Sequence, residues 1–253
     1  MQVGFIGSGN MARALARGWG EPVLCTDSGS GRAAALVAEL GGEVLASNRE
    51  LVERAGLVVL AHKPYQLQDV AAEAAAAADR DTRIVSVLGG TTQAQVRDAW
   101  GGATVIRVEP NTPVEVRRGV LAFAEPDADI DAAALAEVRS RFGRLGTVID
   151  VPERLMGVAG ACSGVGPAYW ALFAEAHIEA AIRRGMPPAT ATALVTATMA
   201  GAAALLAEHG GDTLALRRAV TSPGGSTARG LAALERGGVR AALHDAMDDV
   251  VGR

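Results

Sequence analysis

A glycine-rich turn close to the start of the chain constrains the fold more than any other feature of the sequence. It reads Gly7-Ser8-Gly9-Asn10-Met11-Ala12, between an apolar run at 3–6 and a helical pattern over 10–19. In such a turn the first glycine makes the tight bend, the second lets the backbone approach a pyrophosphate, and the third small residue lets the helix pack on the strand. The free N–H groups of the helix start attract the same anion. The turn therefore predicts a dinucleotide site; the competing interpretation is an ordinary glycine turn in a sheet.

Short apolar runs alternate with helical patterns through the first half of the chain. The runs are at 3–6, 23–26, 43–46, 57–61, 84–87 and 104–107. Asn48 is a plausible N-cap for the helical pattern that ends at Arg54. Strands that alternate with helices in this way form βαβ units and a parallel sheet. We therefore predict a Rossmann-type α/β domain with a parallel sheet over residues 1–151.

The second half of the chain changes character, because no convincing strand follows Pro152. Five helical patterns take over, at 153–160, 167–184, 188–208, 213–220 and 227–236. Residues 152–253 are therefore predicted to form an all-α domain.

Composition and charge exclude several classes of protein. Apolar residues make up 49% of the chain and charged residues 21%, which is typical of a globular protein and not of a disordered one. The net charge is −4 and no basic run stands out, so nucleic acid is not an expected partner. The two cysteines, Cys25 and Cys162, cannot form a disulfide framework, and no histidines stand at ligand spacing. No metal site is expected.

An uncharged stretch at 185–207 could be mistaken for a membrane span. It contains Pro187, Pro188 and several threonines, and alanine supplies most of its apolar character. A span needs roughly 20 strongly apolar residues. A buried helix, as at a subunit interface, is the better interpretation, and with no targeting pattern at the start of the sequence we expect a protein of the cytoplasm, with no membrane partner.

Asp27 ends the second predicted strand, where a dinucleotide fold contacts the ribose. An acidic residue there accepts a hydrogen bond from the 2′-hydroxyl and repels a 2′-phosphate, which favours NAD. Ser28, Ser30 and Arg32 follow at once and could instead hold a phosphate. Asp27 could equally be a solvated turn residue. The sequence leaves the coenzyme open between NAD and NADP.

Two further loops follow predicted strands, and the carboxyl ends of strands face the ligand crevice in a parallel sheet. They are His62-Lys63-Pro64 and Pro110-Asn111-Thr112-Pro113. Lys63 could meet a phosphate or the nicotinamide ribose. In the second half, the small-residue turns at 163–169 and 221–227 each enter a helix, whose free N–H groups could receive a carboxylate.

Taken together, these segments resemble one family, the pyrroline-5-carboxylate reductases. The matching pieces occur in family order: 5–12, Lys63-Pro64, 110–113, Ser163-Gly164-Val165-Gly166-Pro167-Ala168-Tyr169, and Ser222-Pro223-Gly224-Gly225-Ser226-Thr227. The resemblance implies a Rossmann domain and a helical domain that interlocks with a second subunit, in a homodimer or an assembly of dimers. It implies hydride transfer from NADPH or NADH to the C=N carbon of 1-pyrroline-5-carboxylate, a small cyclic imine carboxylate, giving L-proline.

The resemblance also implies roles for individual residues. Thr227 is the catalytic residue, because it looks like the group that hydrogen-bonds the ring nitrogen. The expected substrate residues are Ser222, Gly224, Gly225, Ser226 and Thr227. From the fingerprint, the strand ends and the resemblance together, the expected cofactor residues are Gly7, Ser8, Gly9, Asn10, Met11, Asp27, Ser28, Asn48, Ala61, Lys63, Pro64 and Asn111.

Two departures from the family pattern bear on the substrate. Glu109 stands where methionine is usual, and His62 stands where a small apolar residue is usual. Three alternatives therefore remain: another cyclic imine carboxylate, either six-membered or sulfur-containing; a β-hydroxyacid; or a non-catalytic NAD(P)-binding protein. The β-hydroxyacid class usually carries a catalytic lysine on the long interdomain helix, and no lysine occurs between Pro167 and Arg184.

Overall fold

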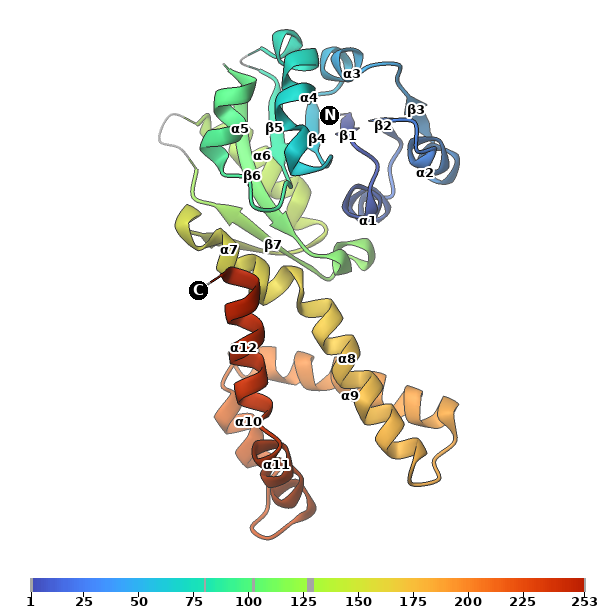
Figure 1. Ribbon diagram of the computed structural model, residues 1–253, viewed down its shortest axis with the longest axis vertical. Coiled ribbons are helices and arrows are strands. Elements are labelled where there is room, and N and C mark those ends of the chain that lie inside the picture. Colours follow the sequence, from blue (N-terminus) through green and yellow to red (C-terminus); the bar gives the residue numbers. More distant parts are fainter. Residues whose placement is uncertain (1, 80, 102, 127–129, 253) are drawn as a thin grey trace. The chain divides into compact units, whose positions relative to one another are not determined.

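The computed structural model describes residues 2–79, 81–101, 103–126 and 130–252. The chain divides into two compact units, Met1–Pro167 and Ala168–Arg253, and each is described by itself (Figure 1). This division by contacts falls later than the predicted domain boundary at 151/152, because the short helices between Glu153 and Gly164 pack with the first unit.

Within the described residues, the first unit is built on one sheet of eight strands in the order β3-β2-β1-β4-β5-β6-β7-β8. The strands are β1 (Val3–Ile6), β2 (Val23–Thr26), β3 (Gly42–Val44), β4 (Leu57–Leu60), β5 (Arg83–Ser86), β6 (Thr104–Pro110), β7 (Gly119–Ala124) and β8 (Gly146–Val151). All neighbours are parallel except β6 and β7, which run antiparallel. The predicted Rossmann-type sheet is confirmed, and the last two strands extend it beyond the prediction.

Helices cover both faces of the sheet. One face carries α1 (Asn10–Trp19), α2 (Arg32–Leu40) and α6 (Ala132–Gly143), and the other carries α3 (Asn48–Arg54), α4 (Leu67–Ala74) and α5 (Gln93–Trp100). Short turns of helix complete the unit: η1 (Pro64–Gln66), η2 (Ala75–Ala77), η3 (Thr112–Val116), η4 (Glu153–Leu155), α7 (Met156–Ala159) and the π-helical turn η5 (Gly160–Gly164).

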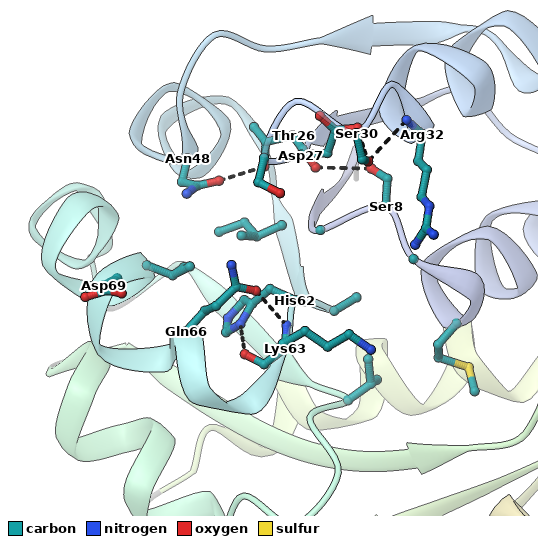
Figure 2. Close-up of a pocket in the computed structure, with 18 of the residues that line it drawn as sticks. Ser8, Thr26, Asp27, Ser30, Arg32, Asn48, His62, Lys63, Gln66 and Asp69 are labelled. Atoms are coloured by element: carbon teal, nitrogen blue, oxygen red, sulfur yellow. Dashed lines mark hydrogen bonds between the residues drawn. The ribbon is translucent and has the colours of Figure 1, made fainter.

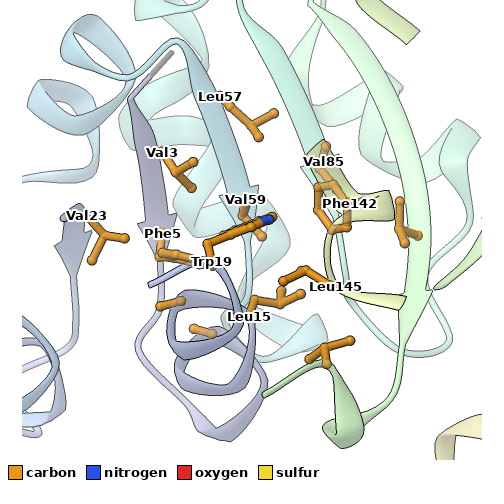
Figure 3. Packing of buried hydrophobic residues seen from close by; sticks show 14 of the residues in the cluster. Val3, Phe5, Leu15, Trp19, Val23, Leu57, Val59, Val85, Phe142 and Leu145 are labelled. Atoms are coloured by element: carbon orange, nitrogen blue, oxygen red, sulfur yellow. The ribbon is translucent and has the colours of Figure 1, made fainter. Parts of the chain in front are cut away.

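Alternating strand residues supply two separate cores. Phe5 and Val59 belong to the cluster under α1 and α6, whereas their neighbours Ile6 and Leu60 belong to the cluster under α3 to α5. This is the period-two alternation of a strand that is covered on both faces. Figure 3 shows the first cluster, with Trp19 between Phe5 and Phe142. The edge-to-face contact of Trp19 with Phe142, at 5.1 Å between ring centroids, fixes α1 against α6.

One predicted cap is wrong. The N-cap of α3 is Ser47, whose Oγ accepts from the Glu50 N–H at 3.1 Å, and not Asn48. Serine and asparagine are equally good caps, so the local sequence does not choose between them. Because Ser47 caps the helix, the Asn48 side chain is available for other contacts.

The second unit consists of helices: α8 (Gly166–Ile182), α9 (Pro188–Glu208), α10 (Thr213–Ala219), α11 (Ser226–Arg236) and α12 (Val239–Val251). The predicted helical half is confirmed, with α12 as an addition. Among the described residues of the chain, α9 is the one helix that is long and apolar enough to cross a membrane, judged by length and composition alone. Only Ala191 and Val195 of α9 are buried within this chain, so the predicted burial at a subunit interface would need a second copy.

Candidate functional site

A cavity of about 840 Å³ opens at the carboxyl edge of the sheet, where the loops after β1, β2 and β4 meet (Figure 2). The chain enters the sheet at β1 and extends it in both directions, so the strand order reverses between β1 and β4. Open α/β sheets bind ligands at such a reversal. The volume lies within the usual range of small-molecule sites.

Most of the predicted cofactor residues line this cavity. They are Gly7, Ser8, Gly9, Asn10, Met11, Asp27, Ser28, Asn48, Ala61, Lys63 and Pro64. The structure thus brings together four segments that are separate in the sequence, at 7–11, 27–28, 48 and 61–64. Several further lining residues were not predicted: Ser47, His62, Gln66, Asp69 and Glu73. Asp69 and Glu73 are four residues apart on α4, so a helical-face argument from the predicted helix could have found them.

The turn after β1 has the geometry that a pyrophosphate needs. Gly7 has φ +93°, and a Cβ there would lie 2.7 Å from the backbone nitrogen of His62, so this position requires glycine. A Cβ on Gly9 would have Ala61 O, at 4.0 Å, as its nearest neighbour, which leaves the approach to α1 open. Gly9 is the N-cap of α1 and supplies no capping side chain, so the first N–H groups of the helix remain available to an anion.

Ser8 and Asp27 organise the neighbouring loops through hydrogen bonds of their own. The buried Ser8 hydroxyl donates to Thr26 O at 3.1 Å and joins the β1 turn to β2. The Asp27 carboxylate accepts from the N–H groups of Gly29 and Ala33, at 2.8 and 2.9 Å. Hydrogen bonds from Ala33 N–H and its neighbours hold the pKa of Asp27 below its usual value, so the side chain is charged at neutral pH.

Asn48, the first residue of α3, links this helix to α4 at the side of the cavity through hydrogen bonds to Glu73. Its Oδ1 accepts from the Thr26 hydroxyl at 2.6 Å, and its Nδ2 donates to Glu73 Oε2 at 2.6 Å. The Asn48 backbone N–H donates to Glu73 Oε1 at 2.7 Å. Asn48 therefore lines the cavity, but its side-chain amide is already bound to two protein partners, and its cofactor role stays a prediction.

The loop after β4 places one cation and one histidine at the cavity. Figure 2 shows Lys63 extended along it, with its backbone N–H donating to Gln66 Oε1 at 3.0 Å. His62 Nδ1 lies 2.9 Å from Lys63 O, which can only accept, so Nδ1 carries the proton. Burial lowers the pKa of His62, so it is neutral, and its buried Nε2 has no hydrogen-bond partner among the described residues.

The predicted substrate segment lies in the second unit, between α10 and α11. Gly224 has φ +69°, and the Gly225 N–H donates to Ser222 O at 3.0 Å, which closes a tight turn. Gly225 is the N-cap of α11 and Ser226 and Thr227 are its first residues, so their N–H groups have no intrahelical acceptor. The Arg229 guanidinium donates to Gly224 O at 2.7 Å and braces the turn from behind.

Comparison with known proteins identifies the family. The family model for pyrroline-5-carboxylate reductase dimerisation matches residues 153–253, and a model described as NADP oxidoreductase, coenzyme F420-dependent, matches residues 2–90. A pyrroline-5-carboxylate reductase of Synechocystis is 34% identical over 254 residues, which cover 98% of this chain and 94% of that protein. This chain belongs to the pyrroline-5-carboxylate reductase family.

Other members agree in sequence and in fold. Pyrroline-5-carboxylate reductase 3 of Mus musculus is 35% identical over 98% of this chain and 92% of its own. The crystal structure of Plasmodium falciparum pyrroline carboxylate reductase with NADP bound has a TM-score of 0.88 at 25% identity and covers 99% of this chain and 95% of its own. A Coxiella burnetii pyrroline-5-carboxylate reductase has a TM-score of 0.86 at 30% identity, over 100% and 96% of the two chains.

Asn111 is the predicted cofactor residue that does not line the cavity. Its Nδ2 donates to Ser163 O at 3.1 Å, and its Oδ1 accepts from the Val120 N–H at 2.8 Å. In this structure its amide joins β6, β7 and the π-helical turn. A cofactor role for Asn111 stays a prediction.

Of the two residues that depart from the family pattern, His62 lines the cavity and Glu109 does not. Its carboxylate packs over Gly160 and lies 3.7 Å from the buried guanidinium of Arg107, which itself pairs with Glu153 at 2.8 Å. Burial raises the pKa of Glu109 above its usual value, although Arg107 acts in the opposite direction. The side chain thus faces the segment that leads into α8 and not the nucleotide cavity.

Proposed function

We propose that this member of the family reduces the C=N bond of 1-pyrroline-5-carboxylate with NADPH or NADH and forms L-proline. The observation that carries the proposal is the cavity at the β1/β4 reversal, built around Gly7 and Gly9. Support for the substrate comes from relatives named for this reaction that align with nearly the whole chain.

The cavity residues fit a dinucleotide. The open approach at Gly9 and the free N–H groups of α1 suit the pyrophosphate, and Lys63 supplies a positive charge on the opposite loop. When bound, the reduced coenzyme supplies a hydride to the imine carbon. The residues of the chain hold and orient the coenzyme at the carboxyl edge of the sheet.

The turn before α11 fits a small carboxylate. The N–H groups of Ser226 and Thr227, with the Ser222 hydroxyl, would receive the carboxylate, and the Thr227 hydroxyl would hydrogen-bond the ring nitrogen. A protonated imine is already electrophilic, so the reaction needs no strong general acid. Orientation of the reactants can supply several of the roughly 7–11 kcal/mol available to well-placed groups.

We propose a homodimer, with further assembly of dimers open. The second unit exposes many large apolar side chains: Trp170, Leu172, Phe173, Leu194, Leu205, Leu214, Val220, Leu234 and Leu243. Helices that bury so little within their own chain require apolar surface from elsewhere. A second copy of the chain would supply this apolar surface and would also cover α9. The match of residues 153–253 to the dimerisation family model supports such a partner. We propose a cytoplasmic protein, in keeping with the free thiols of Cys25 and Cys162.

A coupled assay tests the proposed function. The purified full chain is mixed with 1-pyrroline-5-carboxylate and either reduced coenzyme, and the loss of coenzyme absorbance is followed with proline as the identified product. Faster turnover of a six-membered or sulfur-containing cyclic imine would move the assignment to that substrate. Coenzyme binding without turnover of any imine would favour a non-catalytic NAD(P)-binding protein.

A further inference from the structure

We infer that this chain selects NADH over NADPH, because the Asp27 carboxylate already fills the anion receptor that a 2′-phosphate would occupy. The inference rests on the proposed function only in that the cavity must hold a nicotinamide coenzyme. It resolves the conflict in the sequence between Asp27, which favours NAD, and the adjacent Ser30 and Arg32, which could hold a phosphate.

The loop after β2 folds around its own carboxylate. Asp27 Oδ1 accepts from the Gly29 N–H at 2.8 Å, and Oδ2 accepts from the Ala33 N–H at 2.9 Å and from the Ser30 hydroxyl at 2.9 Å. Figure 2 shows Asp27 and Ser30 joined at the side of the cavity. Two backbone amides and one hydroxyl thus converge on one negative group.

These three donors are the kind that would bind a phosphate. Convergent backbone N–H groups near a helix start, with a serine hydroxyl beside them, make an anion receptor. Here the receptor is saturated from inside the protein, because each of the three protons is directed at Asp27. A 2′-phosphate would find no free donor among them and would lie beside a fixed negative charge. A ribose hydroxyl, in contrast, can donate to the remaining lone pair of the carboxylate.

The other charges around the cavity act in the same direction. Among the described lining residues, the acidic ones are Asp27, Asp69 and Glu73, and the strongly basic ones are Arg32 and Lys63. Glu73 is bound to the neutral amide of Asn48 and not to a cation, so its charge is not cancelled locally. An added phosphate would enter a lining with a deficit of positive charge.

Direct binding of the two coenzymes tests the inference without relying on turnover. Dissociation constants of NADH and NADPH are measured on the purified full chain by titration calorimetry at one ionic strength. We expect NADH to bind at least about tenfold more tightly. Equal binding, or tighter binding of NADPH, overturns the inference while leaving the proposed reaction intact. If neither coenzyme binds, the proposed function fails and the inference fails with it.

A matched pair of variants locates the cause. In Asp27→Ser the three donors are released, and the ratio of the two dissociation constants should move toward NADPH by on the order of tenfold. Asp79→Ser is the control: Asp79 accepts from the Asp81 N–H, the Thr82 N–H and the Thr82 hydroxyl, each at 2.9 Å, but lies outside the cavity lining. It should leave the ratio unchanged. An unchanged ratio in Asp27→Ser would overturn the assignment to Asp27.

A double variant tests whether the gained NADPH affinity comes from a phosphate bound by the loop after β2, and not from a general change in the shape of that loop. Arg32 follows Gly29 and Ser30 in the chain and also lines the cavity, so adding Arg32→Ala to Asp27→Ser should remove most of the gained NADPH affinity. Thermal unfolding of each variant shows whether it folds. If Asp27→Ser does not fold, the coenzyme ratio of the unmodified chain still decides the question.

Discussion

Asn111 joins two segments that are distant in the sequence, with its Nδ2 3.1 Å from Ser163 O and its Oδ1 2.8 Å from the Val120 nitrogen. Its side chain is almost fully buried, at 7% exposure for the residue. A buried amide that satisfies two backbone groups costs about 1–3 kcal/mol to remove. We expect Asn111→Ala to lower the free energy of unfolding by about that amount.

The same variant tests whether Asn111 also contacts the coenzyme. A purely structural role predicts a coenzyme dissociation constant within about twofold of the unmodified value in Asn111→Ala. Asn48→Ala, at a residue that lines the cavity, should weaken coenzyme binding in the same titration. Loss of affinity with normal stability in Asn111→Ala would support the predicted cofactor role instead.

The two glycines of the β1 turn should differ in the kind of damage that alanine causes. Gly7 has φ +93° and no room for a Cβ beside His62, so Gly7→Ala should lower the free energy of unfolding by about 1–3 kcal/mol. Gly9 has φ −73°, which any residue adopts, and open space around it. Gly9→Ala should fold normally but bind coenzyme at least about tenfold less tightly. Urea unfolding and coenzyme titration separate the two effects, and equal behaviour of the variants would contradict this account.

Thr227 should matter for turnover more than for stability. It lies in the first turn of α11, and its hydroxyl makes no hydrogen bond with another described residue. Thr227→Ala is expected to lower kcat by on the order of tenfold to a hundredfold. Thr227→Ser, which keeps the hydroxyl, should retain most of the activity. Unchanged kinetics in the alanine variant would remove Thr227 from the mechanism.

Glu109 should make the protein less stable as the pH rises. Burial raises its folded pKa above the unfolded value, so the folded state binds the proton more tightly. The contribution is therefore most favourable below the unfolded pKa and is lost as pH rises through the folded pKa. Glu109→Gln removes this dependence. The free energy of unfolding of both proteins is measured with urea from acidic to neutral pH. As the pH rises, the Glu109→Gln variant should become more stable relative to the unmodified chain. A difference that does not change with pH would contradict the expectation.

The proposed dimer should depend on the apolar surface of the second unit. Leu205→Glu on α9, at a residue that is 45% exposed within the chain, should yield monomers in light scattering if α9 is covered by a second copy. Val116→Glu is a matched control, because Val116 is 68% exposed and lies on η3 of the first unit. The control should remain dimeric. A dimer that survives Leu205→Glu and Trp170→Glu together would exclude these residues from the interface.

The strands that the sequence predicted and those that it missed differ in their surroundings. Residues 57–60 are an unbroken apolar run, because β4 is central and covered on both faces. In contrast, β8 lies at the edge of the sheet and alternates between half-buried and exposed residues, so its pattern is weak. Its partner β7 follows β6 after a short connection and runs antiparallel to it. A prediction based on repeated βαβ units, whose strands are all parallel, does not include such a strand.

Local patterns were enough to predict the dinucleotide turn at 7–12, the alternation that builds the sheet and the helical second half, because tight turns, apolar periodicity and helix signals depend on neighbouring residues. The hydrogen-bond partners of the polar side chains could be read only from the folded chain. The hydroxyl of Ser30 is directed at Asp27, Ser47 and not Asn48 caps α3, and Asn111 contacts Ser163 and Val120. A polar side chain bonds to whichever donor or acceptor the folded chain brings within about 3 Å of it. For Asn111 these partners come from segments that are distant in the sequence.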